Sequence, residues 1–169
     1  MKRIVKSSSG SSAGFSILEM LIVLLIIATI SGYAVVSFMR TQANLARNDA
    51  AVRFVIALEK AQNDSGKRRN APIPQMAYVK VIDSKSYSLS IDGNGDGIID
   101  SPAVTTLPDL HTLHIRGPFP KYFRYDWLGR FVDNQGQVVT APLVTFATST
   151  GTSMVKAETG SKPQIIYGE

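Results

Sequence analysis

Oxygen-bearing side chains recur at alternate positions between Asp92 and Asp100, a pattern suited to binding a metal ion. They stand at positions 1, 3, 5 and 9 of this segment, with glycine at position 6, as in the first nine positions of a calcium loop. Calcium takes about six to eight hard oxygen ligands, and alternate residues of a tight loop direct theirs at one centre. The candidate Ca²⁺ ligands are Asp92, Asn94, Asp96, the carbonyl of Ile98, and Asp100, directly or through water.

The same segment departs from a complete EF-hand. The twelfth position, normally a bidentate glutamate, is Ala103, and the flanks are a strand-like run and Pro102 instead of two helices. A flexible surface turn is the alternative, because Asp-Gly and Asn-Gly pairs are common in hairpins. Four oxygen residues at this spacing are more than a turn requires, so calcium is favoured. The chain has no cysteine, and a metal would replace disulfides as a stabiliser.

Glu19 is a second candidate functional residue, because it is a carboxylate within an apolar segment. It is the only charged side chain among the 25 residues from Phe15 to Met39. A helix of about 20 apolar residues crosses a bilayer core, so this run predicts a membrane-spanning helix. A carboxylate within such a helix is costly and usually has a partner. The alternative is that Glu19 reaches the headgroup region by itself, because it lies close to the start of the run.

The residues before the apolar run indicate how it is targeted. Residues 1–14 contain Lys2, Arg3 and Lys6 but no acid, and a basic flank stays on the cytoplasmic side of a membrane. A secretory signal carries its small-residue cleavage site after the apolar core. Here the small-residue site comes before the core and ends at Gly14. Cleavage after Gly14 would remove the basic leader and make the apolar helix the new N-terminus.

Gly14, the following Phe15-Ser16-Ile17-Leu18-Glu19 and the adjoining apolar helix together resemble the class III signal of type IV pilins and type II secretion pseudopilins. The resemblance implies that a prepilin peptidase cuts between Gly14 and Phe15 and methylates the amino group of Phe15. It also implies that Glu19 pairs with the Phe15 amine of a neighbouring subunit. The chain would then be a single-pass inner-membrane protein with a cytoplasmic N-terminus before it joins an extracytoplasmic filament, either a pilus or a periplasmic pseudopilus.

The helix is expected to continue beyond the membrane run. No proline occurs between Phe15 and Ala71, and Leu45, Val52, Val55 and Ile56 keep a helical spacing as far as about Asn63. This stripe predicts that the second half of the helix lies against a globular domain. The expected divisions are a leader at 1–14, a membrane and polymerisation half at 15–39, an amphipathic half at 40–64 and a β-rich domain at 65–169.

Short runs of β-forming residues follow the helix. Residues 77–82 and 86–91 flank Asp83-Ser84-Lys85 and predict a hairpin with one buried face. Further strands are expected at 112–115, 121–125, 136–140, 143–147 and 153–156, between turns rich in glycine or proline. The fold class is therefore α+β, and the resemblance implies a pilin fold, in which one long N-terminal helix packs on an antiparallel sheet domain.

The segment from Phe123 to Arg130, with the strands after it, is similar to the pattern of GspH/FimT-type minor pseudopilins and minor pilins. In those proteins an aromatic strand ends in a Gly-Arg turn, here Gly129-Arg130, and leads into two hairpins. The closing strand normally carries another Gly-Arg turn, where this chain has Gly160-Ser161-Lys162. The resemblance implies a structural subunit, minor rather than major, whose partners are other pilin or pseudopilin subunits, with the prepilin peptidase as processing enzyme.

The charge balance gives limited support to a nucleic-acid partner. Subtracting the three basic residues of the leader from the 18 in the chain leaves 15 against 13 acidic residues, so most of the formal charge of +5 is a targeting signal. Some FimT-like pilins are thought to capture DNA, and this is the second hypothesis. Its candidate contacts are Lys67, Arg68, Arg69, Arg116, Lys121, Arg124 and Arg130. A solvated cluster at a helix C-terminus is the alternative interpretation of residues 67–69.

Catalysis is not expected. The chain has no cysteine, its two histidines are His111 and His114, and it contains no nucleophile elbow, P-loop or paired-carboxylate motif. A membrane-anchored calcium-binding domain that never polymerises is the third hypothesis.

Overall fold

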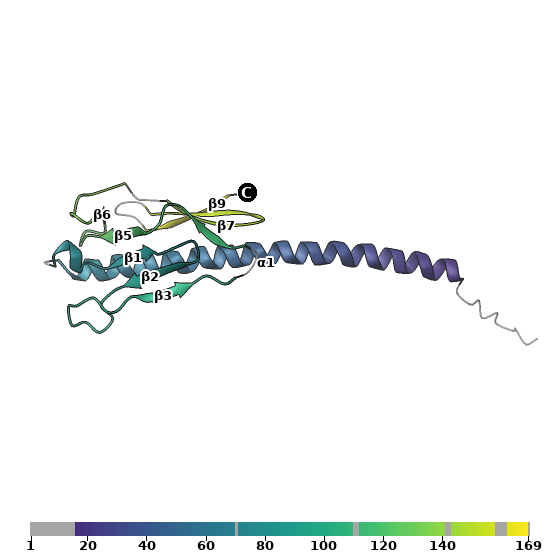
Figure 1. Cartoon of the computed structure of the whole chain (residues 1–169), viewed down its shortest axis with the longest axis horizontal. Coiled ribbons are helices and arrows are strands. Elements are labelled where there is room, and N and C mark those ends of the chain that lie inside the picture. The colour runs from purple at the N-terminus through teal and green to yellow at the C-terminus, as the bar shows by residue number, and fades with distance from the viewer. Residues whose placement is uncertain (1–15, 70, 110–111, 141–142, 158–161, 169) are drawn as a thin grey trace, which may run out of the picture. The chain divides into compact units, whose positions relative to one another are not determined.

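The computed structural model describes residues 16–69, 71–109, 112–140, 143–157 and 162–168. The predictions for the leader, for Gly14 and Phe15, for His111 and for Gly160-Ser161 lie outside these ranges. The chain divides into two compact units, Met1–Met39 and Arg40–Glu169. One helix, α1 (Ile17–Lys67), contributes residues to both units (Figure 1).

In the first unit, α1 begins at a serine cap. The amide of Leu18 donates to Ser16 Oγ at 3.3 Å, and the amide of Met20 donates to the Ser16 carbonyl at 3.1 Å. Every described residue from Ser16 to Met39 is exposed, and nearly all of these side chains are apolar. The helix is long and apolar enough to cross a membrane, with a mean hydropathy of 2.5 in its most apolar window.

In the second unit, α1 buries a stripe of small residues. Its buried apolar side chains are Ala43, Ala50, Ala51, Phe54, Ala57, Leu58 and Ala61. Of the expected stripe, Val55 packs against the core, but Leu45, Val52 and Ile56 were placed wrongly, because they are 64%, 41% and 44% exposed. Five alanines form most of this face, and Phe54 and Leu58 are the large side chains that enter the core from it. The helix also ends later than predicted, at Lys67, with Gly66 inside its last turn.

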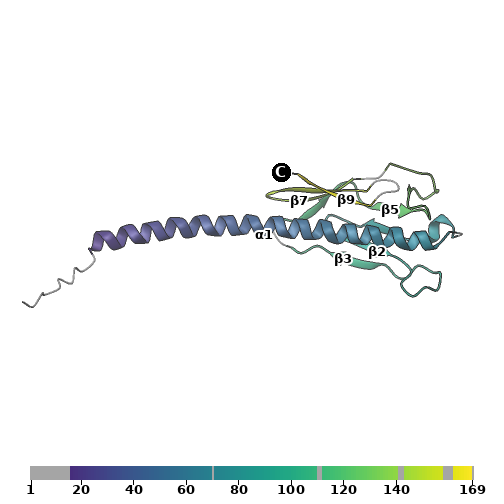
Figure 2. The ribbon, with the colours of Figure 1, turned by 180° about the vertical axis from the view of Figure 1, so that it is seen from behind.

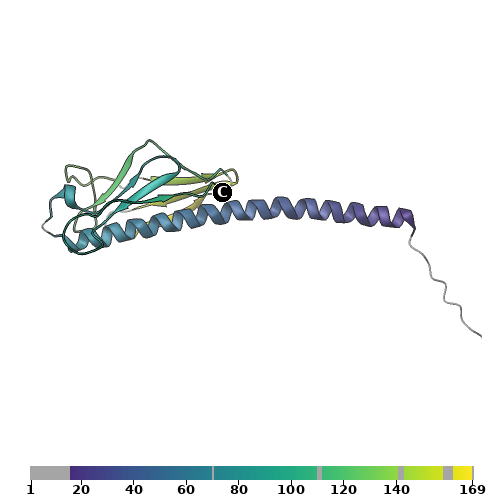
Figure 3. The same ribbon diagram turned by 60° about the horizontal axis from the view of Figure 1, so that its bottom comes forward.

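In the described part of the chain, nine strands follow the helix and form two antiparallel sheets (Figures 1 and 2). The five-stranded sheet has the order β3-β2-β1-β5-β6, and the four-stranded sheet has the order β4-β7-β8-β9. Both lie along one side of the second half of α1 (Figure 3). The strands are β1 (Tyr78–Val81), β2 (Ser86–Ser90), β3 (Ala103–Thr106), β4 (His114–Arg116), β5 (Lys121–Tyr125), β6 (Phe131–Val132), β7 (Leu143–Thr148), β8 (Gly151–Lys156) and β9 (Gln164–Gly168).

The α+β class and the β1-β2 hairpin are confirmed, since Tyr78 pairs with Ser90 and Val81 with Tyr87. The strand expected at 136–140 is wrong: Val138 makes only an isolated bridge to Val132, after a turn closed by a hydrogen bond from Gly136 to Asp133. Strands β3, β6 and β9 were not predicted. The strands also form two sheets where one was expected, because β4 pairs with β7 and not with β5.

Phe54 lies where α1 meets both sheets. Its side chain is fully buried, and its ring is 5.1 Å from that of Tyr87 and 5.6 Å from that of Phe123, both in the five-stranded sheet. It is also 5.6 Å from the ring of Phe146, in the four-stranded sheet. All three are edge-on contacts, a favoured arrangement for aromatic pairs. One helical side chain therefore holds the two sheets to a common core.

Candidate functional site

The segment predicted to bind calcium forms the loop between β2 and β3. The amide of Asp100 donates to the Ile91 carbonyl at 3.0 Å and closes its base. Within the loop, Gly95 and Gly97 have φ angles of 80° and 87°, which residues with a Cβ rarely adopt. The glycine spacing noticed in the sequence is therefore required by the backbone of this turn.

The predicted ligands lie together in this loop, and their side-chain oxygens accept hydrogen bonds from its backbone. Asp92 accepts from the amides of Gly95 at 2.6 Å and Gly97 at 2.8 Å. Asn94 accepts from the amide of Asp96 at 3.0 Å, and Asp96 accepts from that of Ile98 at 2.7 Å. These are the local bonds by which Asp and Asn stabilise turns.

Two further bonds complete this arrangement. The amide of Gly93 donates to Asp100 at 2.7 Å, and the side-chain amide of Asn94 donates to the second carboxylate oxygen of Asp96 at 2.9 Å. Both oxygens of Asp92 and both of Asp96 therefore accept hydrogen bonds within the loop.

Arg68 connects this loop to the end of α1. Its Nη2 lies 2.9 Å from Asp92 Oδ2, and its Nε donates to Asp64 Oδ2 at 3.1 Å. Its Nη1 donates to the carbonyls of Gly97 at 3.0 Å and Gln75 at 3.3 Å. The side chains of Arg68, Asp64 and Asp92 are only 8%, 11% and 7% exposed. Sequence reasoning had assigned Arg68 to a solvated cluster, although the i, i+4 spacing of Asp64 and Arg68 was a signal for this pair.

The environment of Asp92 favours its ionised form. Burial by itself would raise its pKa, but the amides of Gly97 and Gly95 and the charge of Arg68 outweigh that effect and hold the pKa below its ordinary value. Asp92 is therefore a carboxylate whose charge is already balanced by groups of this chain.

In this arrangement the loop already has a cation, the guanidinium of Arg68, beside the first predicted calcium ligand. The described residues contain no group of three or more Asp, Glu, His or Cys side chains gathered to hold a metal. A guanidinium lies beside Asp92, and an added divalent cation would compete with it for the same carboxylate. Calcium binding stays a prediction, and it would require this arrangement to change.

Glu19 lies in the first turn of α1, where a negative charge is favourable next to the positive end of the helix dipole. It is exposed, like its neighbours. The partner expected for it, the amine of Phe15, falls outside the described residues.

The candidate nucleic-acid contacts do not form one surface. Arg68 is held by Asp64 and Asp92, and Arg130 donates to Asp126 at 2.7 Å. The remaining residues lie on different elements. Lys67, at the end of α1, and Arg116, on β4, are exposed. Arg69 lies over the Trp127 ring at 5.9 Å, and Arg124 lies over the Tyr78 ring at 5.2 Å. Lys121 donates to the Leu143 carbonyl at 2.7 Å.

Four residues of β1 and β5 form a basic and aromatic cluster that sequence reasoning did not assemble. Tyr78 pairs with Arg124 and Lys80 with Tyr122, so the four side chains share one face of the five-stranded sheet. The two tyrosine rings are 6.0 Å apart, and Lys80 Nζ is 5.3 Å from the Tyr122 ring centre. The positions on this face of the five strands are Ser, Thr, Val, Tyr, Lys or Arg, so no carboxylate interrupts it. We call it the Tyr-Lys face.

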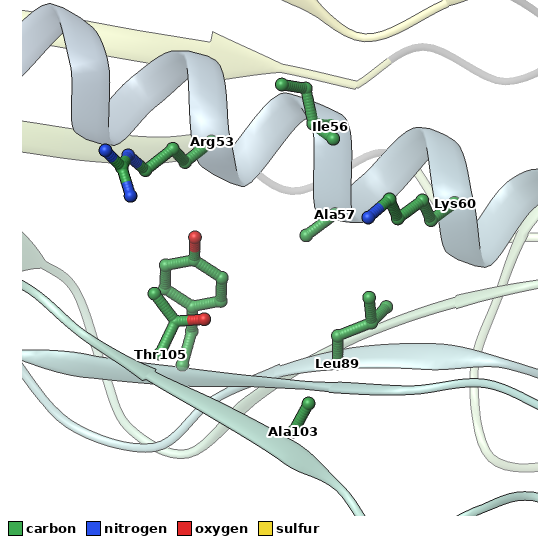
Figure 4. A pocket seen from close by; sticks show the side chains of 8 residues that line it. Arg53, Ile56, Ala57, Lys60, Leu89, Ala103 and Thr105 are labelled. Atoms are coloured by element: carbon green, nitrogen blue, oxygen red, sulfur yellow. The ribbon is translucent and has the colours of Figure 1, made fainter. Parts of the chain in front are cut away.

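A groove separates α1 from β2 and β3 on the opposite side of the same sheet (Figure 4). Its volume is about 320 Å³, and it is lined by Arg53, Ile56, Ala57, Lys60, Tyr87, Leu89, Ala103 and Thr105. Arg53 is paired with Asp49 at 2.8 Å. Burial raises the pKa of Tyr87, and this effect outweighs a hydrogen bond with the Thr105 side chain that favours the ionised phenol. The groove is a mixed apolar and basic surface without a nucleophile and base placed together.

Comparison of this chain with models of known protein families, with curated proteins and with solved structures gave no significant match.

Proposed function

We propose that this chain is a structural subunit, and a minor one, of a type IV pilus or a type II secretion pseudopilus. The observation that carries the proposal is α1: its first part is apolar and exposed on all sides, and its second part packs on antiparallel sheets. An apolar helix without partners in its own chain is stable in a bilayer or among copies of itself. A subunit that moves from the bilayer into a filament would use the same apolar surface of α1 in both environments.

Glu19 gives this assembly its register. A carboxylate in an apolar environment needs a cation, and the free amine created by cleavage after Gly14 provides one on the next copy. Pairing of Glu19 with that amine sets the stagger between neighbouring helices. The uninterrupted α1 supports a filament in which this helix stays intact, since the chain has no proline between Phe15 and Ala71.

The first experiment is the mass and N-terminal sequence of the protein recovered from membranes of the cell that produces it. The proposal expects a chain that begins at Phe15 and carries one added methyl group. A chain that begins at Met1 would instead support a membrane-anchored domain that does not polymerise. A start beyond Tyr33 would identify the apolar run as an ordinary secretory signal.

A second experiment tests assembly. Glu19→Gln keeps the size of the side chain and removes its charge, so we expect membrane insertion without incorporation into filaments, scored by fractionation and immunogold labelling. Glu59→Gln is the matched control, because it changes the same residue type on the same helix within the second unit. Equal incorporation of both variants would contradict the role of Glu19.

DNA binding is the second candidate function, and the Tyr-Lys face favours it. Single-stranded nucleic acids bind where bases stack on aromatic rings beside positive charges. This face offers Tyr78 and Tyr122 beside Lys80, whereas Arg124 is buried against Tyr78. We expect Lys80→Gln to weaken single-stranded DNA binding and to reduce its salt dependence by about one ion. Lys60→Gln, on α1, is the control. A wild-type chain that binds no DNA at low salt would remove this candidate.

A further inference from the structure

We infer that the Asp92–Asp100 loop is fixed in place by the guanidinium of Arg68, which does the work that a bound metal ion does in calcium loops. The inference concerns the source of positive charge in the loop, and it does not depend on the proposed filament.

The need for a cation follows from the charges gathered at this place. Two carboxylates, those of Asp64 and Asp92, contact the same guanidinium, and Asp92 belongs to a loop that also carries Asp96 and Asp100. A cavity of about 400 Å³ adjoins Asp64 and Asp92, and its other lining residues are Lys67, Arg68, Gly93, Asn94, Gly95 and Gly97. Like charges so close together repel one another unless a cation lies among them.

Arg68 has the shape to serve as that cation. A guanidinium is planar, keeps its charge and offers five N–H donors in a fixed arrangement. Here its Nε bonds to Asp64, its Nη2 forms an ion pair with Asp92, and its Nη1 donates to the carbonyl of Gly97. The contact with Asp92 is ionic, without the angle of a hydrogen bond. One side chain thus contacts both a carboxylate and a backbone carbonyl of the loop.

The length of α1 makes this contact available. The helix continues to Lys67 instead of ending near Asn63, so Asp64 lies within its last turn and one turn before Arg68. The backbone amide of Asp92 also donates to Asp64 Oδ2, at 3.4 Å. The helix end and the first residue of the loop are therefore joined through Asp64 as well as through Arg68.

A calcium ion would have to displace these bonds to bind here. Both oxygens of Asp92 and of Asp96 are engaged by loop amides, and Ala103 provides no side-chain oxygen at the twelfth position. Calcium takes about six or more oxygens, so the guanidinium beside Asp92 and the missing oxygen at the twelfth position both weaken this loop as a calcium site. The arginine satisfies the loop without a metal, so the order of the loop becomes independent of divalent cations.

The test is amide hydrogen exchange of the full chain in detergent micelles, read by mass spectrometry over peptides that cover residues 92–100. In the wild-type chain we expect the same protection with millimolar calcium and with chelator. Arg68→Gln should speed exchange of this segment by at least about tenfold in either condition, because the loop loses its cation. Arg53→Gln is the matched control: Arg53 also pairs with an aspartate one turn earlier on α1, but its side chain is 66% exposed.

Two results would overturn the inference. One is a loop in the wild-type chain that gains protection when calcium is added and loses it with chelator, a measurement that needs no variant. The other is an Arg68→Gln chain whose loop exchanges as slowly as that of Arg53→Gln. Should Arg68→Gln fail to fold, Arg68→Lys replaces it, because lysine keeps the charge and loses the planar set of donors. Wild-type protection in the Lys variant would likewise contradict the role of the guanidinium.

Discussion

Replacement of Phe54 by alanine tests whether this side chain holds the two sheets together. Phe54 is fully buried, and its ring contacts Tyr87, Phe123 and Phe146 from strands of both sheets. Phe→Ala changes in protein cores cost about 3–5 kcal/mol, and the cost rises when the surroundings cannot collapse into the cavity. Three rings anchored in two different sheets cannot all move inward, so we expect a loss of about 4–5 kcal/mol.

The measurement is urea unfolding of the full chain in detergent micelles, followed by the fluorescence of Trp127, the only tryptophan. Ile56→Ala is the control, because Ile56 lies two residues further along α1 and is 44% exposed. We expect this control to lose less than about 1 kcal/mol, since little apolar surface is returned to water. The slope of the free energy against urea should be similar in the wild-type chain and both variants, provided that each unfolds in two states.

The reasoning would be refuted by a Phe54→Ala variant that loses about 1 kcal/mol or less, or no more than Ile56→Ala. Such a result would mean that the core closes around the missing ring. The two sheets would then be held by other contacts, and Phe54 would be one core residue among many.

Two further predictions concern the strand β5 and the turn after it. Asp126, which is 4% exposed, accepts bonds from the amides of Leu128 and Arg130 and from Arg130 Nε, so Asp126→Ala should lose about 2–3 kcal/mol in the same urea assay. Asp109→Ala, at a side chain that is 98% exposed, should leave the urea midpoint close to that of the wild type, and equal losses in the two variants would contradict this account. The buried Tyr125 hydroxyl has no hydrogen-bond partner among the described residues, and burial, with the nearby charge of Glu59, raises the pKa of Tyr125. A folded-state pKa above the unfolded value stabilises the fold fully below pH about 10, and this stabilisation is lost as the pH rises further. Tyr125→Phe should therefore be at least as stable as the wild type at neutral pH and should lose less stability between pH about 9 and 11; an identical alkaline loss in urea midpoints would contradict the assignment.

Local patterns in the sequence were enough to predict several elements of this fold. The apolar run from Phe15 to Met39 predicts an uninterrupted helix, because hydropathy and the absence of proline act over neighbouring residues. The β1-β2 hairpin and the strand β5 follow in the same way from alternating side chains between turn residues. The turn at the glycines of the Asp92–Asp100 loop can also be predicted from the sequence, since a positive φ is favoured by the glycine residue itself.

The tertiary structure decided what depends on residues far apart in the chain. Hydrophobic spacing on α1 misplaced Leu45, Val52 and Ile56, because the buried face is selected by packing against the strands, and five alanines with Phe54 and Leu58 form it. The division into two sheets depends on the pairing of β4 with β7, which no local pattern specifies. The cation beside the Asp92–Asp100 loop also depends on a distant residue. The spacing of the loop predicts a metal ion, whereas the fold brings Arg68 to Asp92 from 24 positions earlier in the chain. Helices and strands follow from the periodicity of neighbouring residues. The partner of a buried charge depends on which distant residues the tertiary structure brings beside it.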